Sequence, residues 1–221
     1  MQAGSLATPL AMLSVASGAD RVAAAYAFGI LAGRSGRSAE ASELAAAAQA
    51  LVQMVSSGDR RSRVAGARVA GRVLAASFDP GGVRPPVPAG LIDGVFAMLN
   101  RPNESEQLAA MDALGLLRET SAVTALNERY AFYRKDGQRA LAGGALEALA
   151  RIGDPSSVDL IKGVSADPWA GGRDATALAI VFARERLLKD GSIVLIQQAV
   201  DDRSRRAQAR GYLRELGAPV P

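Results

Sequence analysis

The side chains best suited to binding a partner stand in one seven-residue segment, Arg-Tyr-Ala-Phe-Tyr-Arg-Lys at 129–135. If the segment is helical, Tyr130 and Tyr133 fall on its apolar face and belong to the core, whereas Phe132 falls on the opposite face. An exposed Phe between basic side chains is typical of an anchor for a partner or of a platform for a stacked base. The alternative is that Phe132 packs against another helix. The segment gives four candidate partner-binding residues: Arg129, Phe132, Arg134 and Lys135.

The only tryptophan gives the fifth candidate. Trp169 stands in the segment Asp-Pro-Trp-Ala-Gly-Gly at 167–172, which reads as a turn between two helices. Large aromatic side chains on loops are enriched at interfaces. Burial of Trp169 against the end of a helix pair is an equally common arrangement, because Trp is highly buried on average.

Groups that carry catalysis are scarce. The chain has no histidine and no cysteine, which excludes imidazole acid–base chemistry, His or thiolate metal ligands and thiol nucleophiles. Its Gly-Gly pairs at 81–82 and 171–172 lack the lysine and the strand-to-helix setting of a phosphate-binding loop. The adjacent Asp201 and Asp202 are better explained by a helix end and its cap. The sequence therefore predicts no catalytic residue, cofactor site or metal site, and a protein that is not an enzyme.

The chain is basic, with a net charge of +4 and 26 Lys and Arg residues, almost all of them Arg. A positive surface attracts nucleic acid or an acidic partner. The arginines also fit a structural explanation, because those that open helices can pair with a preceding Asp such as Asp59 or Asp202. Arg-rich and Ala-rich usage is typical of a bacterial genome of high GC content as well. We favour these explanations over nucleic-acid binding, which stays as the less favoured alternative.

An internal repeat indicates the elements that position these residues. The phrase Ala-Leu-Ala-Arg-Ile-Gly-Asp-Pro at 148–155 returns as Tyr-Leu-Arg-Glu-Leu-Gly-Ala-Pro 64 positions later. That offset is two periods of 32, and one period has the length of a helix pair with its turns. Before the first phrase, Leu141 and Ala145 continue the apolar stripe of one helix. A pair of this kind buries its second face only by stacking on the next pair.

Applied to the whole chain, these signals predict an all-α fold, an α-solenoid of about six antiparallel helix pairs in a single domain over 1–221. Asn103 with Glu106 is spaced as a capping box, and Asp59 and Asp202 precede further helices. Alternating strand patterns are absent from the sequence. The first helices of the pairs are expected at 5–17, 38–57, 88–99, 120–135, 155–166 and 191–201, and the second helices at 19–34, 59–76, 104–118, 137–152, 170–188 and 203–216.

The region 103–216 resembles HEAT repeats, in the short variety named for phycobilisome (PBS) lyases. The best copy has an Arg at 139, an Ala-x-x-Ala-Leu stripe at 145–149, Ile-Gly-Asp-Pro at 152–155 and Val-x-x-Leu-Ile from 158. The resemblance implies the solenoid fold and a concave surface lined by the first helices of the pairs. Members of such families serve as scaffolds, adaptors, lyase subunits and nucleic-acid clamps.

Without catalytic groups, the sequence favours a non-enzymatic protein-binding scaffold or adaptor whose partner is another protein. Sequence-tolerant nucleic-acid binding through the Arg-rich face, or a lyase-type chaperone subunit for a pigment, are the alternatives. Whether the chain forms homo-oligomers stays open.

No apolar stretch reaches the 18 or so residues of a membrane span. The segment 5–17 has the length of a signal-peptide core, but no basic residue precedes it, so it is expected to be the first helix. We expect a cytoplasmic location, or a periplasmic or secreted one if a signal segment was removed.

Overall fold

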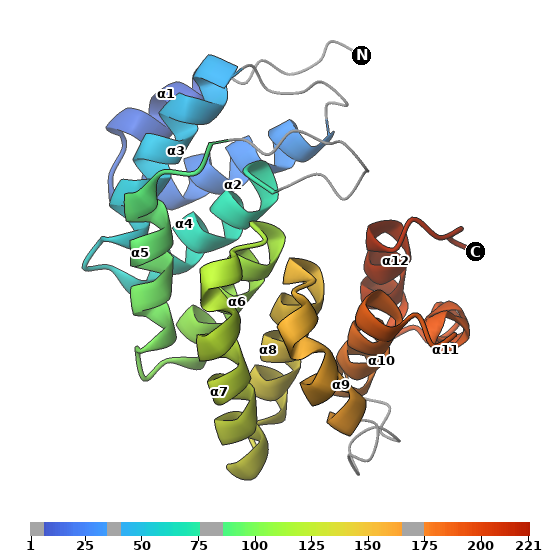
Figure 1. Ribbon diagram of the computed structural model, residues 1–221. Coiled ribbons are helices and arrows are strands. Elements are labelled where there is room, and N and C mark those ends of the chain that lie inside the picture. The colour runs from blue at the N-terminus through green and yellow to red at the C-terminus, as the bar shows by residue number, and fades with distance from the viewer. Residues whose placement is uncertain (1–6, 35–40, 76–85, 165–174) are drawn as a thin grey trace. The chain divides into compact units, whose positions relative to one another are not determined.

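The computed structural model describes residues 7–34, 41–75, 86–164 and 175–221 (Figure 1). These residues form twelve α-helices and two short 3-10 helices, and none of them lies in a β-strand. The chain divides into two compact units, Met1–Leu117 and Arg118–Pro221. Each unit contains three helix pairs.

The first unit is built from three pairs in which short turns reverse the chain. The second helices of its pairs pack side by side, α2 against α4 and α4 against α6, while α1, α3 and α5 pack in a row beside them (Figure 1). The bounds are α1 (Ala7–Val15), α2 (Gly18–Arg34), α3 (Ala41–Val55), α4 (Arg60–Val73), α5 (Ala89–Leu99) and α6 (Glu104–Leu116).

Small residues let α4 approach its neighbours closely. A Cβ atom on Gly66 would lie 2.8 Å from the Cβ of Met54 on α3, and one on Gly71 would lie 3.0 Å from the Cα of Ala113 on α6. Glycine costs about 1 kcal/mol of helix propensity. Here that cost is offset by backbone contact on two sides of α4.

A buried ion pair holds α4 and α6 in register. The Nε atom of Arg63 lies 2.6 Å from Oε1 of Glu106, and both side chains are almost fully buried. Nη1 of Arg63 also donates to the carbonyl oxygens of Ser57 and Gly58 at 2.7 Å. Asn103 caps α6 as expected, by accepting from the backbone N–H of Glu106 at 3.2 Å. The carboxylate of Glu106 pairs with Arg63, so only one of the two hydrogen bonds of a capping box forms here.

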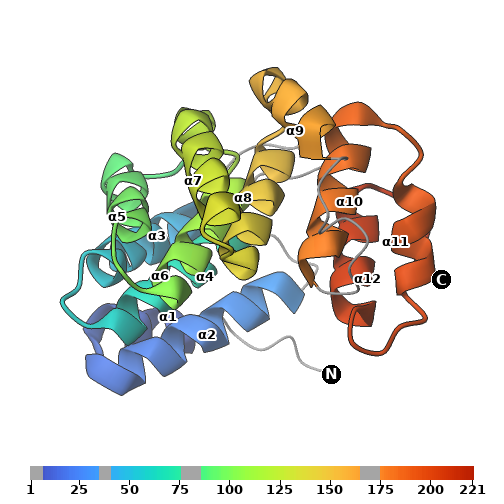
Figure 2. The same ribbon diagram turned by 90° about the horizontal axis from the view of Figure 1, so that it is seen from below.

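The second unit repeats the arrangement. Helices α7 and α8 pair, α10 packs against α8 and α9, and α11 and α12 complete the series (Figure 2). Two of the expected helices open with a 3-10 turn, η1 (Thr120–Ala122) and η2 (Pro155–Ser157), before the α-helix begins. The bounds are α7 (Val123–Lys135), α8 (Arg139–Ile152), α9 (Val158–Val164), α10 (Ala175–Leu188), α11 (Ile193–Ala199) and α12 (Arg206–Glu215).

Aromatic side chains fill the core of this unit. Tyr130 and Tyr133 are 4% and 1% exposed, which confirms their assignment to the apolar face of α7. The rings of Phe182 on α10 and Tyr212 on α12 are stacked, with centroids 4.2 Å apart. A stacked pair of this kind stabilises the fold by more than the burial of its apolar surface area alone.

The predicted all-α fold of antiparallel helix pairs is confirmed, and each of the twelve expected segments contains a helix. Helix ends differ from the expected ones by a few residues; α12, for example, begins at Arg206 instead of position 203. A single domain over 1–221 stays a prediction. Within the described residues, no helix is both long and apolar enough to cross a membrane.

Candidate ligand-binding pocket

The structure brings four of the predicted partner-binding residues together on α7. Phe132 is 55% exposed and therefore contributes little to packing between helices. Its ring meets that of Tyr133 edge to face, with centroids 5.7 Å apart. Arg134 and Lys135 are exposed in the last turn, and Arg129 is half-buried one turn earlier. The fifth predicted residue, Trp169, lies outside the described residues.

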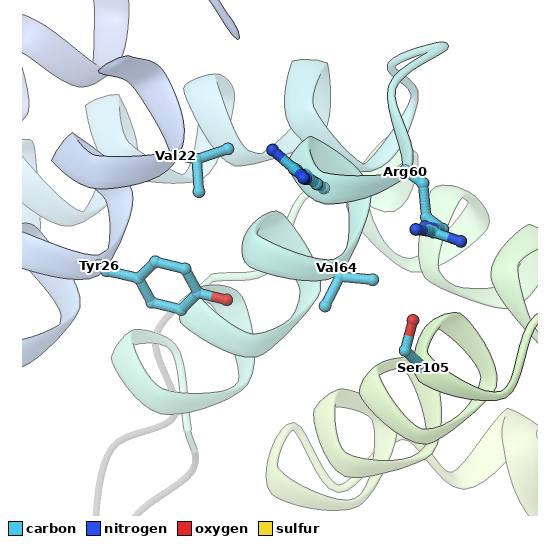
Figure 3. Close-up of a pocket in the computed structure, with 6 residues that line it drawn as sticks. Val22, Tyr26, Arg60, Val64 and Ser105 are labelled. Atoms are coloured by element: carbon cyan, nitrogen blue, oxygen red, sulfur yellow. The ribbon is translucent and has the colours of Figure 1, made fainter. Parts of the chain in front are cut away.

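A pocket that the sequence did not reveal lies in the first unit, between the second helices of its three pairs (Figure 3). Its volume is about 320 Å³. Helices α2, α4 and α6 contribute two, three and one of the lining residues, and none of these side chains is acidic. The lining residues are Val22 and Tyr26 on α2, Arg60, Arg61 and Val64 on α4, and Ser105 on α6.

The start of α4 fixes the two arginines of this pocket. The carboxylate of Asp59 accepts from the backbone N–H and from the hydroxyl of Ser62, both at 2.8 Å, and so caps the helix that Arg60 begins. These hydrogen bonds, with a smaller contribution from the charge of Arg61, lower the pKa of Asp59. The capping carboxylate is thus ionised at neutral pH and engaged with Ser62. Arg60 and Arg61 are exposed at the first two positions of the helix.

The other walls supply a phenol, a hydroxyl and apolar surface. In Figure 3 the hydroxyl of Tyr26 points toward Val64, and the guanidinium of Arg60 lies above Ser105. The hydroxyl of Ser105 also contacts Oδ1 of Asn103 at 2.7 Å. Val22 completes the apolar part of the lining on α2.

This arrangement suits an acidic ligand with an apolar body. Guanidinium groups bind carboxylates and phosphates through paired hydrogen bonds, and the positive end of a helix adds to their attraction for an anion. The volume is at the lower end of the range of about 300–1,000 Å³ that is usual for small-molecule pockets. In the described part of the chain, no group of three or more Asp or Glu side chains could hold a metal ion.

The sequence held only a partial signal for the pocket. Arg60 and Arg61 are among the arginines that we explained by structure and composition, and Val22 and Tyr26 are spaced one helical turn apart. No signal in the sequence predicted how α2, α4 and α6 align with one another. The pocket also lies on the second helices of the pairs, whereas the resemblance to HEAT repeats implied a concave surface lined by the first helices.

A second polar cluster lies inside the other unit. The carboxylate of Glu147 on α8 accepts from Nε2 of Gln208 at 2.9 Å and from the hydroxyl of Tyr212, both on α12. Burial, followed by the nearby charge of Glu147, raises the pKa of Tyr212 well above its usual value. The phenol is therefore neutral and acts as a donor. These contacts join two helices, and we assign them to stability.

Comparison with known proteins relates the fold to a solved structure. No family model matches the chain, and no curated protein sequence is similar to it. Among solved structures, the chain is similar to one in "The structure of the complex of CpcE and CpcF of phycocyanin lyase from Nostoc sp. PCC7120", with a TM-score of 0.66 and 19% identity. The likeness covers 95% of this chain and 76% of that chain. At this identity it establishes the helical-repeat fold.

The same comparison corrects one expectation from the sequence. The absence of histidine and cysteine led us to predict that the protein is not an enzyme, and this prediction is wrong. The fold that the chain shares occurs in a phycocyanin lyase. The absence of imidazole and thiol groups is therefore no argument that the protein is not an enzyme.

Proposed function

We propose that this chain is a lyase-type subunit that binds a bilin-type pigment, an open-chain tetrapyrrole with carboxylate side chains, and acts together with a second protein. The observation that carries the proposal is the pair Arg60 and Arg61 in a partly apolar pocket, within a fold that is similar to a phycocyanin lyase structure. We also infer that the repeats are of the HEAT-like type named for PBS lyases.

The chemistry of the pocket matches the two parts of such a pigment. Its carboxylates would pair with Arg60 and Arg61, and its pyrrole rings would pack on Val22, Val64 and the ring of Tyr26. A tetrapyrrole is larger than a pocket of about 320 Å³, so one end would be held and the rest would stay accessible. Partial enclosure suits a protein that receives a pigment and passes it on.

A protein partner is part of the proposal. The similar structure is a complex of two proteins, CpcE and CpcF. On this chain, Phe132 with Arg134 and Lys135 offers an exposed aromatic anchor beside two positive charges. Exposed aromatic and Arg side chains are enriched among residues that dominate binding energy. The protein-binding role that we predicted from the sequence thus becomes one half of the proposed function.

Gel filtration with biliverdin tests whether the protein binds the pigment. We expect the protein to carry biliverdin absorbance through the column and the double variant Arg60→Gln/Arg61→Gln to lose most of it. The matched control is Arg203→Gln/Arg214→Gln, which removes the same charge from exposed sites of the second unit. If biliverdin does not travel with the wild-type protein, or travels equally with both double variants, the pocket is not its site.

A further inference from the structure

The outward side of α4 carries more arginine than the pocket uses. The helix contains five arginines and no Asp or Glu. Arg63 turns inward to Glu106, and the other four are exposed. Arg60 and Arg61 line the pocket, whereas Arg68 and Arg72 lie farther along the same side, one helical turn apart.

These two outer arginines have a setting unlike that of Arg63. No described residue forms an ion pair or a hydrogen bond with the guanidinium group of Arg68 or of Arg72. Two like charges one turn apart on a helix are unfavourable by a few tenths of a kcal/mol. An acidic surface placed against them would remove that repulsion and gain paired hydrogen bonds.

The neighbouring helix α2 has an apolar side chain at the same height along its axis as Arg68 on α4. A Cβ atom on Gly29 of α2 would lie 3.4 Å from Cγ1 of Val69, so the next residue, Ile30, lies at the level of Arg68, one helical turn after Tyr26 of the pocket. Ile30 is 44% exposed. We call the surface formed by Ile30, Arg68 and Arg72 the arginine surface.

We propose that the protein that accepts the pigment docks on the arginine surface through an amphipathic helix, with carboxylates one turn apart facing Arg68 and Arg72 and an apolar side chain facing Ile30. The role of the docked protein as acceptor rests on the proposed function. Seven residues separate Arg61 from Arg68, which is about 10 Å along an α-helix. A protein bound there reaches the open side of the pocket without crossing the molecule.

The same observations favour a protein over nucleic acid. A phosphate backbone has no apolar group to cover Ile30, and nucleic-acid binding surfaces use longer runs of basic groups with exposed aromatic side chains between them. An amphipathic helix supplies both carboxylates and an apolar side chain at the spacing that the surface presents.

Fluorescence anisotropy with a designed peptide tests the docking surface. The probe is a helical peptide with Glu at every fourth position and Leu beside them, and the reference peptide has Gln in place of Glu. We expect Arg68→Gln/Arg72→Gln to weaken binding of the Glu peptide at least tenfold and Ile30→Ser to weaken it severalfold. Arg203→Gln/Arg214→Gln is the control for the loss of two charges, and circular dichroism checks that each variant is folded.

Three results would overturn the proposal. The first is equal affinity for the Glu and Gln peptides, and the second is a control that weakens binding as much as Arg68→Gln/Arg72→Gln does. The third is a single-stranded 20-nucleotide DNA that binds more tightly than the Glu peptide and depends on Arg68 and Arg72 but not on Ile30. That last result would assign the surface to nucleic acid.

The pigment and peptide assays separate the two proposals. A wild-type protein that retains no biliverdin refutes the pigment proposal and leaves the peptide result standing. A peptide that binds without regard to Arg68 and Arg72 refutes the docking surface, while the pocket is judged by biliverdin alone.

Discussion

Arg151 and Glu215 hold the same place in the sequence repeat, 64 residues apart, and form a two-point ion pair. Nε of Arg151 lies 2.9 Å from Oε2 of Glu215, and Nη2 lies 3.0 Å from Oε1. Copies of a repeat thus carry opposite charges at one position, and the pair joins α8 to α12 where both pack against α10. The repeat places the two side chains at equivalent positions. Because one copy has Arg and the other has Glu, the two can form an ion pair.

Breaking this pair should lower stability. The side chains of Arg151 and Glu215 are only 9% and 17% exposed, so Arg151→Gln leaves Glu215 partly buried without its two donors. We expect the free energy of unfolding in urea to fall by about 2 kcal/mol, between the costs of an exposed and a fully buried pair. Lys162→Gln is the control, because its pair with Asp159 is exposed and should change stability by less than about 0.5 kcal/mol. Equal effects of the two variants would contradict the assignment.

Two glycines inside helices should respond in opposite directions to alanine. At Gly66 a new Cβ would lie 2.8 Å from the Cβ of Met54, so Gly66→Ala should destabilise the protein by about 1–3 kcal/mol. At Gly211 on α12 no atom lies within 4 Å of the new Cβ, so Gly211→Ala should stabilise it by up to about 1 kcal/mol. Thermal unfolding of both variants measures the difference. A stabilising Gly66→Ala would show that α3 and α4 pack less closely than described.

Local signals in the sequence were enough to predict the helices. The repeat phrase, the Asp59 and Asn103 caps and the apolar stripe with Tyr130 and Tyr133 act over one or two turns, and each is found as expected. Helix starts were less exact, because a 3-10 turn and an α-helical turn are favoured by the same residues, as at Pro155.

The side-chain contacts between helices could not be predicted from the sequence. The pocket forms only because α2, α4 and α6 align Tyr26, Arg60 and Ser105, which are separated by whole helices in the chain. The buried pair of Arg63 and Glu106 was missed for the same reason, although we expected some arginines to link repeats. The prediction that the protein is not an enzyme failed because the absence of histidine and cysteine does not exclude an enzyme.

The turn before α12 should contribute to stability in a pH-dependent way. Hydrogen bonds to Asp202 from the hydroxyl and the N–H of Ser204, followed by Arg205, lower the pKa of its carboxyl to about 2. A lowered pKa in the folded state stabilises the protein above the ordinary pKa of Asp, and this contribution is lost as the pH falls toward about 2. Asp202→Asn should therefore lower the Tm at pH 5, with a difference from wild type that narrows toward pH 2.

Asp201→Asn serves as the control for that experiment, because it removes the same charge from the neighbouring exposed residue. A Tm difference for Asp202→Asn that stays constant from pH 5 to pH 2 would rule out a role for the ionised carboxylate.

Phe132 should be dispensable for folding. Because its ring is 55% exposed, Phe132→Ala should change the free energy of unfolding by less than about 0.5 kcal/mol. The adjacent Tyr133 is 1% exposed, and Tyr133→Ala should cost about 3–5 kcal/mol. Urea unfolding of the two variants makes the comparison. A large loss of stability for Phe132→Ala would mean that the ring serves packing and is not available to a protein partner.

The central claim is that Arg60 and Arg61 hold the carboxylates of a bilin-type pigment, and its most direct test is the dissociation constant for biliverdin from an absorbance titration. Hydrogen bonds to charged groups contribute about 1.5–3 kcal/mol each, so Arg60→Gln/Arg61→Gln should raise the dissociation constant at least tenfold. The control Arg203→Gln/Arg214→Gln should leave it within about twofold of wild type, because those side chains lie in the other unit. Equal dissociation constants for all three proteins would contradict the account.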